Sequence, residues 1–273
     1  MNAEAGWQGL TATRRRGDGS YEQLVLDVAD ERPVAIAYHG VEHAVMMATP
    51  DDLEDFALGF TLAEAIALAP DDVRSIQTGE RPTGELTLDI TLSPARLHAF
   101  LAARRRRNRI GHGGCGVCGT EDFTKALPMP RPHPAPSAEP SPHAVLHALG
   151  ALRGAQPLAR RTRGAHAAAW AGPDGTLVLV REDVGRHNAM DKLLGAFART
   201  DNDPREGFCV LTSRCSVELV QKAAIAGFGV LVCVSAPTTM AVRWADQAGL
   251  TLLAAVHDDA FTVFTGQDLA RTS

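Results

Sequence analysis

The chain has 273 residues, of which 45% are hydrophobic, and a formal net charge of -5. This length and apolar content support one large domain or two smaller ones, and the acidic balance argues against a general nucleic-acid or membrane-surface binder. We expect a cytoplasmic protein, because no apolar run reaches the ~18 residues of a membrane span, no signal peptide is recognisable, and the five cysteines do not form a secreted disulfide pattern.

The first 127 residues predict a smaller α+β part. Residues 1–20 are expected to form a loose tail. Two helices are expected, one capped by Asp51 and Asp52 that runs to Leu68, and one that starts at Ser93-Pro94 with a cap and a first-turn proline. Short strands are expected at 22–28, 33–38 and 43–48, and strict alternation of apolar and polar residues predicts a half-buried strand at 85–92.

Residues 128–142 hold seven prolines in fifteen positions, which predicts an extended linker. From 143 to 273 the rhythm changes to strands alternating with helices of about ten residues, which indicates an α/β domain around a mainly parallel sheet. Strands are expected at 165–170, 176–181, 208–212, 229–235, 250–256 and 261–265. Helices are expected at 142–152, 187–199, 216–226 and 238–248, and Gly227 and Gly249 stand where helix C-caps belong.

Three strand-to-helix loops of this domain are expected at one edge of the sheet. They are 182–186, 212–216 and 235–239. Ligands of open α/β sheets bind at the carboxyl ends of the strands. Hydroxyl groups, free helix N–H groups and the two arginines Arg186 and Arg214 favour a phosphate-bearing ligand there. The alternative is that the Ser and Thr residues are ordinary N-caps.

The motif Cys115-Gly-Val-Cys118 lies in a glycine-rich segment directly after the basic run 104–109. Nearby cations favour the thiolate, which is the reactive form of cysteine, so the motif indicates sulfur chemistry at an accessible turn. Two alternatives remain open. The pair is half of a structural zinc site, with His112 as a third ligand or with a second chain sharing the metal. Otherwise it is the redox pair of a thiol–disulfide oxidoreductase.

The segment 181–192, REDVGRHNAMDK, is unusually polar for a strand-to-helix junction. His187 and Asp191 are four residues apart and share a helix face, so the carboxylate is in a position to orient the imidazole. A helix N-terminus favours the neutral ring, which suits a base or a hydrogen-bond donor. A charged capping network is the alternative. Cys209 and Cys233 lie in apolar strands and are expected in the core, and packing is also the favoured role of Cys215.

Together these segments closely resemble the FdhD family. The stretches that match are Ala57-Leu-Gly-Phe60, Gly114-Cys-Gly-Val-Cys-Gly119, His166-Ala-Ala-Ala-Trp170, the segment 181–192, Ser213-Arg-Cys-Ser216, Ser235-Ala-Pro-Thr238 and Gly249-Leu-Thr-Leu252. They follow the family's order from about residue 22 to 266. A zinc-deaminase activity is not expected, because His166-Ala-Ala lacks the glutamate of the H-x-E signature.

The resemblance implies a sulfurtransferase that serves formate dehydrogenase. Family members accept sulfur from a cysteine desulfurase as a persulfide, here on Cys115, with Cys118 as the second cysteine of the site. They pass it to the molybdenum bis(molybdopterin guanine dinucleotide) cofactor of formate dehydrogenase. The resemblance also implies a cytidine-deaminase-like α/β fold and a homodimer. From the charge and the lack of an apolar span, no nucleic-acid or membrane partner is expected.

The cofactor-binding residues expected from these loops and from the resemblance fall in two groups. The first is Arg186, His187, Ser213, Arg214 and Ser235. The second is the family's cofactor segment, here Ala255, Val256, His257, Asp258, Asp259 and Ala260. Two acids replace the basic character expected in this segment, and a carboxylate there would repel a phosphate.

Overall fold

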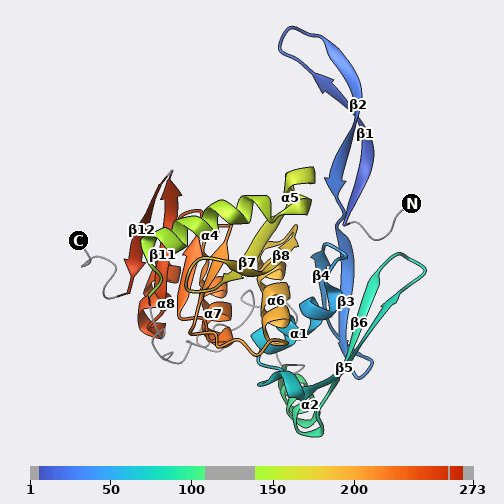
Figure 1. Ribbon diagram of the computed structural model, residues 1–273. Helices are drawn as coiled ribbons and strands as arrows, with labels where there is room; N and C mark the ends of the chain where they lie inside the picture. Colours follow the sequence, from blue (N-terminus) through green and yellow to red (C-terminus); the bar gives the residue numbers. More distant parts are fainter. Residues whose placement is uncertain (1–5, 108–138, 258, 267–273) are drawn as a thin grey trace.

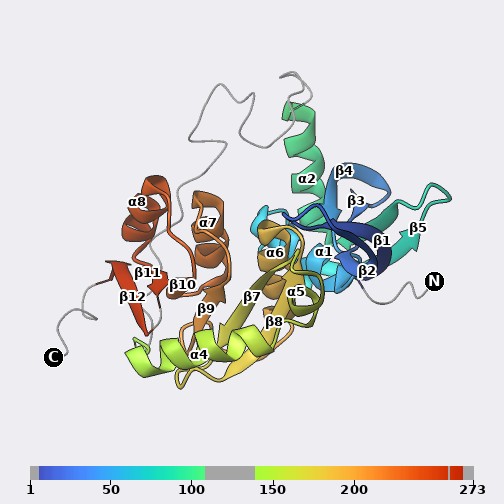
Figure 2. The ribbon, with the colours of Figure 1, turned by 90° about the horizontal axis from the view of Figure 1, so that it is seen from above.

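The computed structural model describes residues 6–107, 139–257 and 259–266. The C-terminal half is a six-stranded sheet covered by helices, and the N-terminal half holds a four-stranded sheet and a two-stranded hairpin that projects from the body (Figures 1 and 2). Among these residues, no helix combines the length and the apolar character needed to cross a membrane.

The six-stranded sheet is sandwiched between helices. Across the sheet its strands are β12 (Ala260–Thr265), β11 (Thr251–His257), β10 (Val230–Cys233), β9 (Phe208–Leu211), β7 (His166–Ala171) and β8 (Leu177–Asp183). Figure 2 shows α4 (Pro142–Gly154) along one face, whereas α6 (Arg186–Phe197), α7 (Val217–Ala226) and α8 (Thr239–Ala248) cover the other.

Residues of one strand alternate between the two cores, as the period of a β-strand requires. In β9, Cys209 and Leu211 pack with α6, α7 and α8, whereas Phe208 and Val210 pack with α4. Because both faces are covered, all four residues of this strand are apolar and almost fully buried.

The expectation of a mainly parallel sheet was wrong, because the sheet is mixed. Only the β9–β10 and β10–β11 pairs are parallel, whereas β7–β8, β7–β9 and β11–β12 are antiparallel. The reason is connection length. Residues 172–176 join β7 to β8 through a turn with Gly175 at φ 85°, and a parallel crossover needs a dozen residues or more.

The shared edge of the three expected loops is nevertheless confirmed. Both β8 and β9 run antiparallel to β7, so they share a direction, and β10 and β11 run parallel to β9. The carboxyl ends of β8, β9, β10 and β11 therefore lie along one edge of the sheet.

The N-terminal sheet has the strands β4 (Val41–Ala48), β3 (Arg32–Tyr38), β6 (Leu86–Leu92) and β5 (Val73–Glu80) in this spatial order. Its core includes Val34, Ile36, Leu88 and Ile90, and two helices flank it, α1 (Leu53–Ala63) and α2 (Pro94–Arg107). The start of α2 at Pro94 confirms the predicted helix start. Strand β5 was not expected, because its sequence alternates poorly and its strand structure depends on pairing with β6.

Two further expectations for the N-terminal half are corrected. Residues 7–15 are not a tail but strand β1 (Trp7–Arg15), which pairs along its whole length with β2 (Tyr21–Ala29). Helix α1 is also shorter than expected and ends at Ala63. Asp52 occupies the N-cap with φ 52° but makes no side-chain capping bond.

A buried ion pair joins the two halves. Lys192 Nζ on α6 lies 2.8 Å from Asp183 Oδ2 at the end of β8, and both side chains are fully buried. Each ion also reaches the N-terminal half at Thr49, whose N–H donates to Asp183 Oδ2 (3.0 Å) and whose carbonyl accepts from Lys192 Nζ (3.1 Å). Asn188 Nδ2 donates to both Asp183 Oδ1 and the Met47 carbonyl. Much of the polar segment 181–192 is therefore a junction between the halves.

Glycine allows α1 and α6 to cross at close range. A Cβ added to Gly59 on α1 would lie 1.7 Å from the Asp191 carbonyl oxygen, and one added to Gly195 on α6 would lie 1.9 Å from the Asp55 carbonyl oxygen. Any larger side chain at either position forces the two helices apart. This close approach fixes α6, and therefore its first residues Arg186 and His187, relative to the N-terminal half.

We predict that Lys192→Met destabilises the protein by about 3–5 kcal/mol, because it leaves the Asp183 carboxylate buried without a counter-ion. Urea unfolding followed by circular dichroism at neutral pH measures the loss. The matched control is Arg205→Ala, which breaks the exposed Arg205–Asp203 pair and is expected to stay close to wild type. Equal effects of the two substitutions would contradict the structural role of the buried pair.

Candidate functional site

The carboxyl edge of the six-stranded sheet gathers polar and charged residues from several elements. Strand β7 starts at this edge with His166, which pairs with Asp183 in the register of β7 and β8. Helix α6 starts there with Arg186 and His187, and α7 starts after Ser216. From β8 to β11 the edge crosses four strand spacings, or about 19 Å at ~4.8 Å per strand. That length suits an extended ligand with more than one recognition point.

His187 connects the first loop with the second. Its Nε2 lies 3.3 Å from Ser216 Oγ and 3.9 Å from Glu218 Oε2, and its side chain is 34% exposed. Burial, and then the charge of Arg186, lower the pKa of His187, so the imidazole is neutral at neutral pH. The predicted neutral ring is thus supported, although burial rather than the helix dipole is the main cause.

Arg186 carries a buried donor that points to a missing partner. Its Nε is one of two buried side-chain nitrogen or oxygen atoms without a hydrogen-bond partner among the described residues, the other being Trp170 Nε1. The pKa of His166 is lowered mainly by burial and then by the charge of Arg186. A buried arginine donor beside two neutral imidazoles is a chemically suitable place for an anionic group of a ligand.

Asp191 does not orient His187, contrary to the expectation. Its carboxylate instead pairs with Lys222 Nζ of α7, and burial raises its pKa to about 6. Asp191 is almost completely buried between α1, α6 and α7. Four-residue spacing correctly placed the two residues on one helix, but the neighbouring α7 supplied the partner of the carboxylate.

The second and third loops are tied together. Cys215 and Pro237 form an isolated parallel bridge, and the Thr238 N–H donates to the Cys215 carbonyl at 3.0 Å. The alternative role as an N-cap is confirmed for Thr238, whose hydroxyl accepts from the Ala241 N–H. Ser213 is buried and its hydroxyl donates to the Arg214 carbonyl, whereas the Arg214 side chain is exposed.

The three described cysteines pack in the core, as expected. Cys209, Cys215 and Cys233 are each 0% exposed. Burial raises the pKa of Cys209 and of Cys233, which keeps both as neutral thiols. None of the three is presented to solvent, so the accessible sulfur chemistry predicted for this chain does not arise from them.

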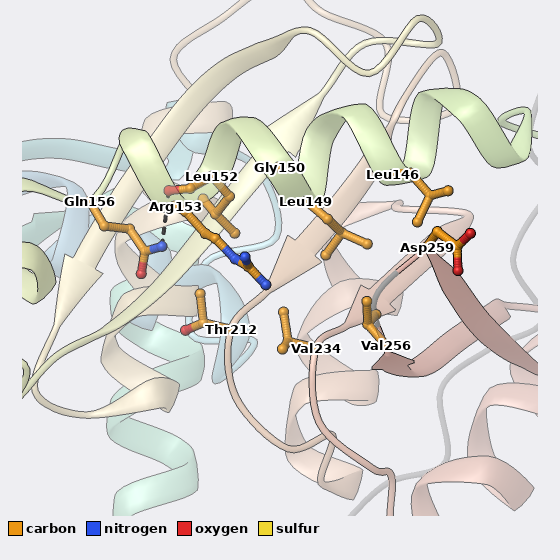
Figure 3. A pocket seen from close by; sticks show the side chains of 10 residues that line it. All are labelled: Leu146, Leu149, Gly150, Leu152, Arg153, Gln156, Thr212, Val234, Val256 and Asp259. Carbon is orange, nitrogen blue, oxygen red and sulfur yellow. Dashed lines mark hydrogen bonds between the residues drawn. The ribbon is translucent and has the colours of Figure 1, made fainter.

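A pocket of about 490 Å³ opens at the same edge, on the side of α4. Its walls come from α4 and from the ends of β9, β10 and β11, and Figure 3 shows Arg153 pointing from the helix toward Thr212 and Val234. The lining residues are Leu146, Leu149, Gly150, Leu152, Arg153, Gln156, Thr212, Val234, Val256 and Asp259. Apolar walls with a few polar groups are typical of a small-molecule site.

The expected cofactor segment lies partly in this pocket. Val256 and Asp259 line it, whereas His257 and Ala260 are exposed at the β11–β12 turn. Ala255 has φ 53°, and the register of β11 with β12 shifts between Ala254 and His257, which marks a bulge. Bulges and positive φ angles are common next to functional sites, where they redirect side chains. The Ala255 N–H donates to the Ser235 carbonyl at 3.4 Å, which joins this segment to the third loop.

Three predicted site residues, Cys115, Cys118 and Asp258, lie outside the described residues. Arg153 and Gln156 line the pocket but were not expected there, whereas Thr212 belongs to the predicted loop 212–216. Helix α4 was predicted, but its sequence contains no signal that it lies over the carboxyl ends of β9, β10 and β11.

Comparison with known proteins identifies the family. A model of the FdhD/NarQ family matches residues 29–270. The chain belongs to the FdhD/NarQ family. A relative from Xanthomonas euvesicatoria pv. vesicatoria, named "Sulfur carrier protein FdhD", is 48% identical over 257 residues, which cover 94% of this chain and 90% of the relative. A relative of the same name from Bordetella petrii is 45% identical over 247 residues, which cover 89% of this chain and 86% of the relative.

A solved structure also supports the fold. A crystal structure described as a formate dehydrogenase accessory protein from Desulfotalea psychrophila has a TM-score of 0.74, with 21% identity, and the match covers 97% of this chain and 99% of that one. This FdhD/NarQ protein therefore shares its chain path with that structure across both halves. The likeness to cytidine deaminases is not tested by these comparisons and stays a prediction.

We predict that acid destabilises the fold through His166 and His187. Because the pKa of each is lower in the folded state, the unfolded chain binds their protons more tightly. Their contribution to stability is complete above the unfolded pKa of about 6.5 and is lost as the pH falls through the folded pKa. Urea unfolding between about pH 7.5 and about pH 5 is therefore expected to show a smaller loss for His187→Gln than for wild type.

Asp191 changes the pH dependence of stability in the opposite direction, so the effect of His187 is measured as the difference between His187→Gln and wild type. Its pKa of about 6 in the folded state means that its proton stabilises the fold as the pH falls toward the unfolded value of about 4. This contribution is common to wild type and His187→Gln and cancels in their difference. A difference that does not change with pH would contradict the proposed burial of a neutral His187.

Proposed function

We propose that this protein is a sulfurtransferase that acts as a sulfur carrier for formate dehydrogenase. It accepts sulfur from a cysteine desulfurase as a persulfide on Cys115 and delivers it to the molybdenum bis(molybdopterin guanine dinucleotide) cofactor of that enzyme. The observation that carries the proposal is the match of 94% of the chain, at 48% identity, to a relative named as a sulfur carrier. The Cys115-Gly-Val-Cys118 motif supplies a suitable thiol pair.

The loading step is a thiol exchange that needs no further oxidant. The Cys115 thiolate attacks the outer sulfur of the desulfurase persulfide, and a new sulfur–sulfur bond forms on Cys115. The old sulfur–sulfur bond breaks, and the desulfurase cysteine leaves as a thiolate. The arginine run 104–109 favours the attacking thiolate, and a reducing cytoplasm keeps the accepting thiol available.

The residues of the carboxyl edge suit an anionic dinucleotide. The buried Arg186 Nε, which has no partner within the described part of the chain, suits the phosphates at the β8 end of the edge, as do the neutral His166 and His187. The α4 pocket suits a ring system between Val234 and Val256. With the phosphates at Arg186, the acidic character of the segment 255–260 no longer opposes phosphate binding, because Asp259 lies at the pocket end of the edge. The bound cofactor supplies the metal-centred chemistry, and these residues bind and orient it.

The size of the pocket limits how much of the cofactor is enclosed. A volume of about 490 Å³ suits a ligand of roughly drug size, whereas this cofactor consists of two linked dinucleotides. We therefore propose that one nucleotide arm enters the pocket while the remainder lies along the open edge. We also propose that the protein acts as a homodimer.

Sulfur loading gives a direct test. After incubation with a cysteine desulfurase and cysteine, intact-mass measurement is expected to show a gain of one sulfur atom on the wild-type protein. Cys115→Ala is expected to abolish the gain, because it removes the accepting thiol, whereas Cys118→Ala is the matched control and is expected to retain most of it. A wild-type protein that gains no sulfur would contradict the carrier function.

The same two variants separate the alternatives. A thiol–disulfide oxidoreductase requires both cysteines, so it predicts equal losses in Cys115→Ala and Cys118→Ala. A structural zinc site predicts stoichiometric zinc in the purified protein and its loss in both variants. Elemental analysis of the same samples measures this.

Nucleotide binding is tested with guanosine diphosphate. Calorimetry is expected to show binding to the wild-type protein, and Arg186→Gln is expected to weaken it about 10- to 100-fold through loss of charge-assisted hydrogen bonds. The control is Arg205→Gln, because Arg205 precedes β9 and therefore lies at the opposite edge of the sheet. Equal affinities of wild type and Arg186→Gln would contradict the phosphate-binding role of Arg186.

A further inference from the structure

The β1–β2 hairpin has two chemically different faces. In an antiparallel pair, residues directly opposite each other share a face. The pairs Leu10↔Leu26 and Ala12↔Leu24, with Val28 opposite Gln8, give one face that we call the leucine face (Leu10, Ala12, Leu24, Leu26 and Val28). Gln8 and the Arg14–Glu22 ion pair lie at the two ends of this same face. The opposite face mixes the polar residues Thr11, Thr13, Gln23 and Asp27 with the more widely spaced apolar residues Trp7, Tyr21, Val25 and Ala29. Such alternation is typical of a sheet that covers something with one side only.

The body of the protein holds the hairpin by the face opposite the leucine face. Asp27 pairs with Arg161 of helix α5 (Pro157–Thr162) at 2.8 Å, and the Arg161 guanidinium lies 3.6 Å from the centroid of the Trp7 ring. Trp7 and Asp27 both lie on the face opposite the leucine face. Leu10, Leu26 and Val28 remain 49%, 43% and 43% exposed.

A hairpin of this kind is not expected to remain uncovered in water. Isolated two-stranded hairpins are at best marginally stable, and this one projects from the body with nine paired positions (Figure 1). A contiguous apolar face on such an arm marks an interaction surface. A second apolar surface is available on β4, where Val45 and Met47 are 56% and 48% exposed. They share one side of the strand, while Ala44 and Met46 point to the core.

We propose that the leucine face of each hairpin packs on the β4 surface, Val45 and Met47, of a second copy of this chain. Area favours this arrangement. One face of the hairpin, about 30 Å long and two strands wide at ~4.8 Å per strand, covers roughly 300 Å². Two hairpins stacked on each other would bury roughly 600 Å² in total. Two arms that each lie on a partner body bury roughly 1,200 Å², which reaches the range of about 1,200–2,000 Å² that stable interfaces bury.

Symmetry and length fit the same arrangement. A two-fold axis repeats any arm-to-body contact, so each copy gives one arm and receives one. Strand β4 has eight residues and is about 27 Å long, close to the length of the hairpin. The proposal rests only on the two-copy state proposed above and is independent of the sulfur chemistry of Cys115.

Sedimentation velocity over a range of protein concentrations tests the surface with adjacent residues of one strand. Leu26→Glu is expected to convert the dimer to a monomer, because it places a charge in the apolar contact. The matched control is Val25→Glu, which introduces the same charge on the opposite face of the hairpin and is expected to stay dimeric. Val45→Glu is expected to give a monomer through the receiving surface. Circular dichroism confirms that each variant is folded.

Each other outcome overturns the proposal in a recognisable way. A monomeric wild type removes the two-copy state itself. A dimer that persists in Leu26→Glu shows that another surface joins the copies. Loss of the dimer in Leu26→Glu but not in Val45→Glu shows that the hairpins stack on each other. A dimeric Leu26→Glu that no longer accepts sulfur from the desulfurase shows that the hairpin docks the donor instead. Sulfur loading of the wild type, measured separately, decides the carrier function.

Discussion

The position of the carboxyl edge depends on the buried contact between the Asp183 carboxylate and the Lys192 ammonium. Two buried charges are costly unless they are paired and hydrogen-bonded, and here both also bond to Thr49 of the N-terminal half. The pair can therefore be satisfied only when β8, α6 and the segment after β4 are docked together. Docking in turn places Arg186 and His187, at the start of the same helix as Lys192, at the end of the six-stranded sheet.

The edge that results has two chemically different ends. At β8, an arginine donor that has no partner among the described residues and two imidazoles of lowered pKa form a neutral-to-cationic region. At β11, a bulge brings Val256 and Asp259 into an apolar pocket closed by α4. A ligand with phosphates at one end and a flat ring at the other would match both. The difference between the two ends of the edge would therefore determine the orientation of the proposed cofactor as well as its position.

The hairpin illustrates a different kind of constraint. Its register is fixed by nine pairs, and register decides which side chains share a face. Because Trp7 and Asp27 contact Arg161 from the opposite face, the leucine face is turned away from its own body. An apolar face held outward by specific contacts on the reverse side is a structural basis for association between copies.

The sequence by itself determined the family, the elements with strong periodicity such as β6 and α6, the helix start at Pro94 and the common edge of the three loops. These features depend on the spacing of residues along the chain and on the order of strands and helices, and both can be read directly from the sequence. It did not determine β1 and β5, whose strand structure comes from pairing, or the mixed sheet, which follows from short connections. The partner of Asp191 and the pocket below α4 were decided only by tertiary packing, because both depend on which distant element lies against a given helix or strand end.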